Sequence, residues 1–550
     1  MKKILSLILA ILMLAPFFSL VGCKQESDIT ILRICNCEDY IDESLIDQFE
    51  EENPDIDVVY STYGTNENLY NELVINPNSY DLVVPSEYMI EKLANEGRIQ
   101  PLFSQERDAQ MIDKLDDYET NVSSFIKDRL KNIPITQGIY KNAYNLYDFM
   151  VGYMWGTMGW VYDTAIEDIE NYVSSWAGVF NNSSLNGKIT IKDAVRDSYL
   201  VGLAMVYQEE LTNILASSDD DATKNAKITE VLNRTDSTAI NLVGQKLSSL
   251  KSKLYGFEVD SGKNDIVLGR INAYVAWSGD ATYAIDLACG DDIDEDGNVL
   301  EEDKWRYLSY SVPEEGSNIW FDGFVMPSGS TNYDAVYKFL EFISRPENVF
   351  ANMDYTGYTG MVANGEFDFT EYDENGEEIE TRKNTTIFSE MCNYWELDER
   401  SYLLDVAGLT DENQITDAVL TEYGYQKVDL SYFFKKDSQD TTDYNVIVSN
   451  DSYGRLIAQY PTKEIVDRCA VMKYYENDQL LAINEMWEGV KGETFPIGLI
   501  IGIIVLVVIL AVVILLYRFK DKIKWVKINI KRKTYAEKHN LKLVKKEFIK

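Results

Sequence analysis

An apolar run that ends in a turn, Tyr80-Asp81-Leu82-Val83-Val84-Pro85-Ser86-Glu87-Tyr88, closes the first series of strands and helices in the chain. Strand-like runs and helical patterns alternate before it: Ile29 to Cys37, 42–53, Asp57 to Tyr63 and about 66–73. This alternation predicts an α/β fold with a parallel sheet between helices, in which ligands lie beyond the carboxyl ends of strands. Ser86 and Tyr88 stand at such an end, although a Pro-Ser turn that starts a helix near Glu87 explains them equally well.

A second informative run, Ala276-Trp277-Ser278-Gly279-Asp280-Ala281-Thr282-Tyr283, follows an apolar strand-like segment. It brings an indole, a carboxylate and a phenol within seven positions. An aromatic face attracts an ammonium group and a carboxylate adds a charge-assisted hydrogen bond, so the run suits an organic cation. A buried Trp beside a turn with a solvated Asp is the alternative.

The 550-residue chain divides into an acidic body and a basic tail. Residues 518–550 hold thirteen Lys or Arg and three Asp or Glu, a net charge of +10, which leaves −50 for residues 1–517 out of a total of −40. An acidic body disfavours nucleic acid and favours cationic solutes, although solubility alone also explains it. The only histidine, His539, lies in the tail, which removes Ser-His-Asp and Cys-His catalysis from the body.

Both ends of the chain carry membrane signals. Met1-Lys2-Lys3 and an apolar run lead to Leu20-Val21-Gly22-Cys23, which resembles a bacterial lipoprotein signal over residues 1–23 with lipid attached to Cys23; an uncleaved anchor is the alternative. The uncharged stretch 497–517 is long enough for a transmembrane helix. Because basic residues follow it, we expect the tail in the cytoplasm and the body outside the cell membrane.

Five further cysteines give an odd number, so disulfide pairing stays open: Cys35, Cys37, Cys289, Cys392 and Cys469. Cys35 and Cys37 would share one face of a strand, but no second Cys or His pair accompanies them, and we expect no metal site and no cofactor.

Seven motifs then occur in a recognisable order: Arg33 to Tyr40, Tyr60 to Tyr70, Tyr80 to Tyr88, Tyr153 to Thr157, Asp193 to Asp197, Trp277 to Tyr283, and Val312 to Asp322. Over residues 29 to about 362, and again over 460–491, the chain resembles the spermidine/putrescine-binding proteins of bacterial ABC transporters. The resemblance implies a two-lobed clam of the periplasmic-binding-protein type II fold with a cleft between its lobes. Residues 24–150 and 282–326 would form lobe 1, and residues 151–281 and 327–494 lobe 2.

The resemblance also implies the residues that line the cleft: Tyr40, Ser86, Tyr88, Asp193, Asp197, Trp277, Asp280, Trp320, Asp322 and Tyr358. The chemistry agrees, because a polyamine has separated positive charges on an apolar stem and needs separated carboxylates with flat surfaces between them. Asp193, Asp280 and Asp322 are far apart in sequence and close to aromatic residues.

The chain departs from the family at two places. Cys37 stands where the family commonly has Trp, which leaves the preferred polyamine open. An acidic insertion at about 365–456 has no assigned role; it could cover the cleft, meet a permease or pack onto the second lobe. Within it we predict a hairpin around Asn375-Gly376 and a strand from Val428 to Phe434.

Asp292 to Asp303 resembles a calcium loop, although a solvated acidic hairpin explains it better. The sequence therefore favours a non-enzymatic, membrane-tethered receptor that binds a polyamine, contacts membrane lipid and an ABC permease, and binds no nucleic acid. The alternatives are a receptor for another small cation or ferric ion, a non-transport surface protein, and a glycan-binding enzyme.

Overall fold

The computed structural model describes residues 29–104, 109–289, 306–372, 378–492 and Lys531. The chain divides into two compact units, Met1–Ile483 and Asn484–Lys550, and the first unit contains the strands of the central sheet. No helix in the described part of the chain is long and apolar enough to cross a membrane. Several predicted features lie outside the described residues: Cys23 with its signal, the span 497–517, the tail 518–550 apart from Lys531, and the acidic loop 292–303.

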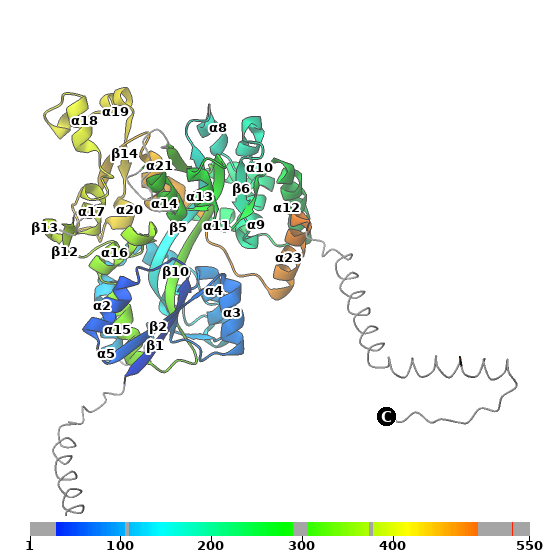
Figure 1. Cartoon of the computed structure of the whole chain (residues 1–550), viewed down its shortest axis with the longest axis vertical. Helices are drawn as coiled ribbons and strands as arrows, with labels where there is room; N and C mark the ends of the chain where they lie inside the picture. The colour runs from blue at the N-terminus through cyan, green and yellow to red at the C-terminus, as the bar shows by residue number, and fades with distance from the viewer. Residues whose placement is uncertain (1–28, 105–108, 290–305, 373–377, 493–530, 532–550) are drawn as a thin grey trace, which may run out of the picture. The chain divides into compact units, whose positions relative to one another are not determined.

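The first strands and helices form as the sequence predicts. Three strands pair in parallel: β1 (Thr30–Cys37), β2 (Ile56–Tyr63) and β3 (Leu82–Val83). Helices connect or follow them: α2 (Ser44–Glu52), α3 (Asn66–Ile75) and α4 (Glu87–Asn95). A short strand β4 (Ile99–Gln100) follows. In Figure 1, α2 lies on one side of these strands and α3 and α4 on the other, so both faces are covered.

Two long strands join this part to the rest of a mixed sheet. Strand β5 (Met150–Asp163) and strand β10 (Ser317–Pro327) are antiparallel, and every residue in both is buried. One end of β10 pairs with β3 and β4, whereas the far end of β5 pairs with β8 (Ala273–Trp277) and β9 (Leu308–Ser311). The sheet path is β2-β1-β3-β10-β5-β8-β6-β7, completed by β6 (Ile189–Lys192) and β7 (Gly256–Glu258). The two long strands therefore cross between a first half (β1 to β4) and a second half (β6 to β9).

Helix contacts differ from the lobe boundaries expected from the sequence. Helix α14 (Ser278–Cys289) packs against α13 (Gly262–Val267), β8 and β9, so it belongs with the second half. Helix α15 (Tyr333–Ile343) packs against α2 and β1 and belongs with the first half. Each helix stays with the strand half that buries its apolar face, so α14 and α15 lie opposite to the expected assignment, whereas α21 packs against β9 and α14 as expected for lobe 2.

The remaining elements of the first unit complete the two halves. Helices are α5 (Ala109–Ile112), α6 (Asp116–Asn121), α7 (Ser124–Lys131), α8 (Ile169–Val173), α9 (Val195–Val206), α10 (Gln208–Leu215), α11 (Asp221–Leu232), α12 (Ser237–Leu250), α16 (Pro346–Thr356), α21 (Tyr453–Gln459), α22 (Lys463–Asp467) and the start of α23 (Asn477–Lys491). Short strands are β11 (Thr359–Gly360), which pairs with β5, and β16 (Cys469–Ala470), which pairs with β10.

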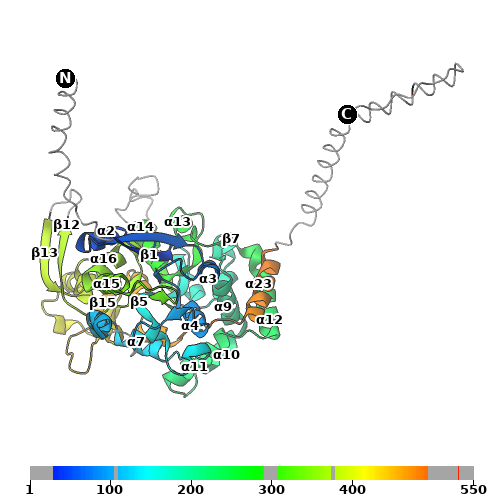
Figure 2. The same cartoon turned by 90° about the horizontal axis from the view of Figure 1, so that it is seen from below.

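The acidic insertion at about 365–456 is folded into helices and strands. It contains β12 (Phe367–Tyr372), β13 (Glu378–Thr385), α17 (Ile387–Asn393), α18 (Arg400–Val406), α19 (Asp417–Tyr423), β14 (Tyr425–Asp429), α20 (Ser431–Phe434) and β15 (Asn445–Ser449). The predicted hairpin is confirmed by the antiparallel pairing of β12 and β13, which lie beside α16 in Figure 2. The predicted strand to Phe434 is wrong beyond Asp429, because the Asp429 carboxylate accepts the Ser431 N–H and starts a helical turn.

Aromatic contacts fix the insertion to the body. Phe350 of α16 stacks on Trp395 with ring centroids 4.8 Å apart, and Phe433 of α20 stacks on Trp155 of β5 at 5.2 Å. Ser123, just before α7, donates to the carbonyl of Phe433 at 2.7 Å. The insertion thus packs onto α16 and β5, which belong to the residues expected for lobe 2, and also onto α7, which belongs to those expected for lobe 1.

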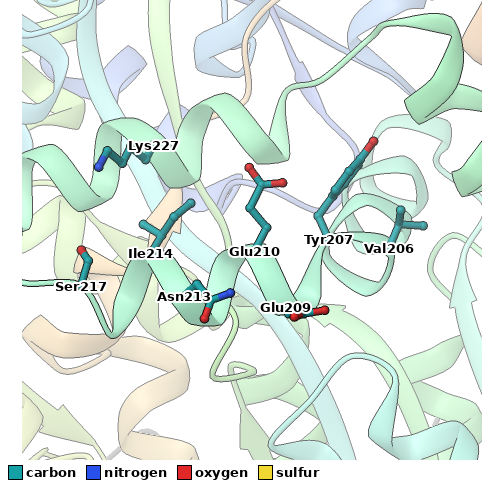
Figure 3. A pocket seen from close by; sticks show the side chains of 8 residues that line it. All are labelled: Val206, Tyr207, Glu209, Glu210, Asn213, Ile214, Ser217 and Lys227. Carbon is teal, nitrogen blue, oxygen red and sulfur yellow. The ribbon is translucent and has the colours of Figure 1, made fainter.

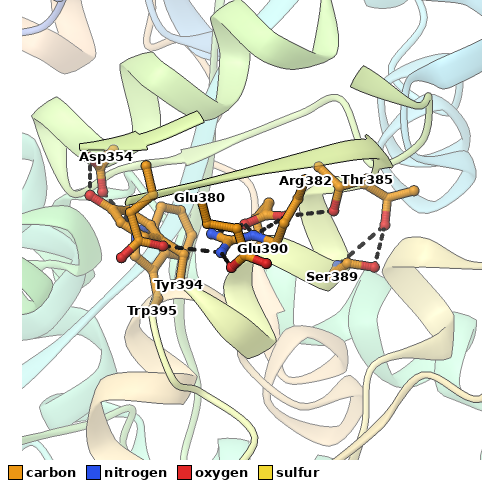
Figure 4. A network of polar contacts seen from close by, with 10 residues as sticks. Asp354, Glu380, Arg382, Thr385, Ser389, Glu390, Tyr394 and Trp395 are labelled. Atoms are coloured by element: carbon orange, nitrogen blue, oxygen red, sulfur yellow. Dashed lines mark hydrogen bonds and ion pairs between the residues drawn. The ribbon is translucent and has the colours of Figure 1, made fainter. Parts of the chain in front are cut away.

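An ion-pair network holds the hairpin of the insertion. Arg382 on β13 contacts the carboxylates of Glu371, Glu380 and Glu390, and Glu390 is fully buried (Figure 4). Thr385 also donates to Glu390. A buried carboxylate requires such partners, and Arg382 supplies the cation for Glu390.

We predict that Arg382→Met destabilises the hairpin by roughly 3 kcal/mol, because the change leaves the Glu390 carboxylate buried without its cation. Amide hydrogen exchange of β13 measures this loss. The matched control is Lys383→Met, since Lys383 pairs with Asp368 on the surface and its loss should change the opening free energy by less than ~0.5 kcal/mol. Equal protection in both variants would contradict the assignment.

Candidate functional site

A buried carboxylate on β10 faces the carboxyl ends of β1 and β3. The Tyr40 hydroxyl donates to Asp322 Oδ2 at 2.8 Å, and Ser86 also hydrogen-bonds this carboxylate. Asp322 Oδ1 has no hydrogen-bond partner among the described residues, and no described Lys or Arg nitrogen lies within 4.0 Å of the side chain. Burial raises the pKa of Asp322 to about 6, against the lowering effect of Ser86 and Tyr40. This is an anionic site to which the described part of the chain supplies no cation.

Glu87 adds a second buried carboxyl group nearby. It is the first residue of α4, is 1% exposed, and accepts the Phe321 N–H at Oε2 over 2.9 Å. Its Oε1 has no hydrogen-bond partner among the described residues. Burial raises its pKa from 4.5 to about 8 against the Phe321 hydrogen bond, with a smaller contribution from the Asp322 charge. The sequence around Glu87 predicts only the start of a helix, because nothing local indicates that its side chain points inward.

Trp277 and Asp280 contact the same ammonium group, but it belongs to a lysine of the chain. Lys192 Nζ lies 4.1 Å from the centroid of the Trp277 ring and donates to Asp280 Oδ2 at 3.2 Å. It also donates to the Val259 carbonyl at 2.7 Å and lies 4.0 Å from Glu258 Oε1. Sequence reasoning missed Lys192. The signal was a lysine at the last position of a buried strand, where a charge requires a partner.

Tyr88 carries a second internal cation. The Arg196 guanidinium of α9 lies between two rings, 3.9 Å from the centroid of Tyr88 and 4.3 Å from that of Tyr475. Its Nε is 3.3 Å from Glu67 Oε1 on α3, and the Tyr88 hydroxyl donates to the same oxygen over 3.3 Å. Arg196 therefore joins the first and second halves of the sheet, a role that the sequence analysis did not assign.

The two predicted carboxylates on the α9 side have different environments. Asp197 is buried in the first turn of α9 and accepts the Trp277 indole N–H. Burial raises its pKa to about 6, while the Lys192 charge opposes the increase. Asp193 is half-buried at the end of β6, where its backbone N–H donates to the Glu258 carbonyl at 2.7 Å.

Tyr358 links the two sides of the site. Its hydroxyl donates to Asp280 Oδ1 at 2.9 Å, and its ring centroid lies 5.0 Å from that of Tyr40 and 5.7 Å from that of Trp320. A Cβ at Gly156 would lie 2.7 Å from the Trp320 ring, so only glycine allows β5 to approach this wall. The contacts connect Ser86, Asp322, Tyr40, Tyr358, Asp280, Trp277 and Asp197 in one set. Their role in binding stays a prediction.

A separate cavity of about 500 Å³ lies between α10 and α11 (Figure 3). It is lined by Val206, Tyr207, Glu209, Glu210, Asn213, Ile214, Ser217 and Lys227. None of these is a predicted site residue, and all are exposed or half-buried. The cavity lacks the buried charges that hold a small polar ligand.

We predict that Glu87→Gln stabilises the protein at pH 8 but not at pH 4. The folded protein holds the Glu87 proton up to about pH 8 and the unfolded chain only to about 4.5, so wild-type stability falls as the pH rises through this window. Glutamine keeps the shape without the charge, and the gain at pH 8 should be on the order of 3 kcal/mol. Urea unfolding at both pH values measures it.

Glu51→Gln, on the exposed face of α2, is the control and should behave as wild type. A Glu87→Gln effect that is the same at both pH values would contradict a raised pKa.

Comparisons with known proteins agree on one family. The model of a family described as bacterial extracellular solute-binding protein matches residues 44–365. The spermidine/putrescine-binding periplasmic protein of Salmonella typhimurium is 26% identical over 329 residues, which are 60% of this chain and 76% of that protein. The putrescine-binding periplasmic protein PotF of Escherichia coli is 26% identical over 365 residues, 65% of this chain and 84% of the relative.

A solved structure supports the fold alone. A Listeria monocytogenes protein assigned to a spermidine/putrescine ABC transporter has a TM-score of 0.51 at 20% identity, and the match covers 84% of this chain and 99% of that one.

Proposed function

Since the family model covers residues 44–365, the chain belongs to the bacterial extracellular solute-binding proteins, and we propose that it captures a polyamine outside the cell for an ABC transporter permease. Relatives that are 26% identical are named for binding spermidine or putrescine. The proposal includes no chemical conversion of the ligand, in keeping with relatives that are transport proteins.

The observation that carries the proposal is the Asp322 carboxylate. It is buried, has one oxygen without a hydrogen-bond partner and no Lys or Arg within 4.0 Å among the described residues, and lies beside Tyr40. The rings of Tyr40, Tyr358 and Trp320 form a continuous apolar wall. An ammonium group would neutralise the carboxylate, while methylene groups would lie against the rings.

We propose that β5 and β10 form the hinge between two lobes, with the ligand enclosed between Asp322 on one side and Asp197 on the other. The ion pair of Arg196 with Glu67 supports a closed arrangement, because it joins α9 to α3. The roles of the other predicted residues belong to this proposal, whereas Lys192 already occupies the position between Trp277 and Asp280.

Ferric ion is the competing ligand, because phenolates of tyrosines could bind it. Burial raises the pKa of Tyr40 and of Tyr358 well above 10, and both hydroxyls already donate to carboxylates. Phenolate formation is therefore unfavourable at these positions, which favours an ammonium ligand.

We predict that Asp322→Asn weakens putrescine binding by roughly 2–5 kcal/mol, because it removes the charge but keeps the shape of a desolvated partner. Titration calorimetry measures the affinity. Binding to the wild type should also tighten from pH 5 to pH 7, because the Asp322 carboxyl, with a pKa of about 6, loses its proton over this range. The variant should lose only part of this pH dependence, because Asp197, with a pKa of about 6, still loses its proton over the same range.

Asp47→Asn, on the exposed face of α2, removes the same charge from the surface and is the matched control. If both variants lose the same small amount of affinity, bulk acidity attracts the polyamine and the Asp322 assignment is wrong.

We propose in addition that lipid on Cys23 and a helix at 497–517 tether the body outside the membrane, with the tail inside. Cys23→Ala should abolish incorporation of radiolabelled palmitate, and continued labelling would refute lipid attachment.

Protease added to intact cells should digest the body but spare an epitope placed after Lys550. Loss of the epitope would refute the proposed orientation.

A further inference from the structure

We infer that Lys192 permanently occupies one of the ammonium positions of the cleft, so that the receptor selects diamines over triamines. This inference rests on the proposed function and names the substrate class of the same site. Lys192 would determine which ligand binds by occupying this position, without contacting the ligand itself.

The Lys192 ammonium has two hydrogen-bond acceptors, a second carboxylate nearby and an aromatic ring beneath it. It has the Val259 carbonyl at 2.7 Å, Asp280 Oδ2 at 3.2 Å and Glu258 Oε1 at 4.0 Å, and it lies over the Trp277 ring. A ligand ammonium would need the same kinds of partner, a carboxylate and an aromatic face. Since Lys192 is 1% exposed, a second cation cannot share this position on the ring.

A free amine would also compete poorly with this lysine. Lys192 ends β6, is in parallel register with Glu258 on β7, and its carbonyl accepts the Ser198 hydroxyl. The ammonium is tethered to a fixed strand, so its effective concentration at Asp280 far exceeds that of a dissolved ligand. The position therefore stays filled when a ligand binds.

Two buried acidic positions remain for a ligand, besides the half-buried Asp193. Asp197 and Asp322 are buried and have no Lys or Arg nitrogen within 4.0 Å among the described residues. Glu87 holds its proton at neutral pH, because its pKa is raised to about 8. The two buried anionic groups match the two ammonium groups of a diamine, whereas a third ammonium would be desolvated near Lys192 without a buried anionic partner.

Titration calorimetry of the full-length chain with putrescine and spermidine tests the inference. The wild type should bind putrescine at least tenfold more tightly than spermidine. In Lys192→Met the linear apolar side chain keeps the bulk but frees Asp280, and the ratio should shift by at least tenfold toward spermidine. An unchanged ratio in this variant would overturn the inference.

Lys263→Met is the matched control. Lys263 lies 2.9 Å from Asp260 and 5.3 Å from the centroid of the Tyr283 ring, and it also interacts with the Asp280 charge, but it does not contact Trp277. This variant should keep the wild-type preference. If both lysine variants shift the ratio equally, general charge and not the position on Trp277 sets specificity, and the inference falls.

If Lys192→Met does not fold, the affinities of the wild type for putrescine and spermidine test the inference instead. Spermidine binding at least as tightly as putrescine would overturn the inference but leave the proposed function intact. Binding of neither amine to the wild type would overturn the proposed function itself. A tenfold preference for putrescine, together with equal affinity for its one-carbon-longer homologue cadaverine, would support selection by the number of charges.

Discussion

Strands β5 and β10 hydrogen-bond to each other from Ile319 opposite Thr157 to Val325 opposite Met150, and both halves of the sheet are built outward from this pair. Because both strands are buried along their whole length, their backbone groups need partners at every position. Strands of the first half pair with one end of β10, and strands of the second half pair with the far end of β5. The pairing therefore fixes where the chain crosses and where the candidate site can form.

The site depends directly on this pair. Strand β10 carries Trp320 and Asp322, and β5 carries Gly156, whose missing side chain gives the Trp320 ring its space. Tyr358 follows α16 and reaches both Tyr40 and Asp280. Side chains from distant parts of the chain thus form one wall because two strands hold their backbones in register.

The carboxylates in and around the candidate site differ in whether a cation of the chain neutralises them. Asp280 and Glu67 have cations from the chain itself, Lys192 and Arg196, whereas Asp322 has hydrogen bonds but no cation within 4.0 Å among the described residues. Burial without a cation is unfavourable for a carboxylate and raises its pKa, so Asp322 is the position where a ligand charge contributes most. The unpaired Asp322 charge therefore lowers the stability of the free protein, and the same charge raises its affinity for a cation.

The sequence by itself determined the elements and the chemistry available to them. Period-two and helical patterns gave the correct strands and helices up to Glu87, since these patterns depend on neighbouring residues. The order of the motifs predicted the family and identified Tyr40, Trp320 and Tyr358 as candidate site residues. The tertiary structure decided which carboxylates already have a cation. Lys192 and Asp280 are 88 positions apart, and Arg196 and Glu67 lie on two different helices, α9 and α3, so no local sequence pattern indicates their pairing. Charge pairing depends on distance in space, and only the packed strands and helices set that distance.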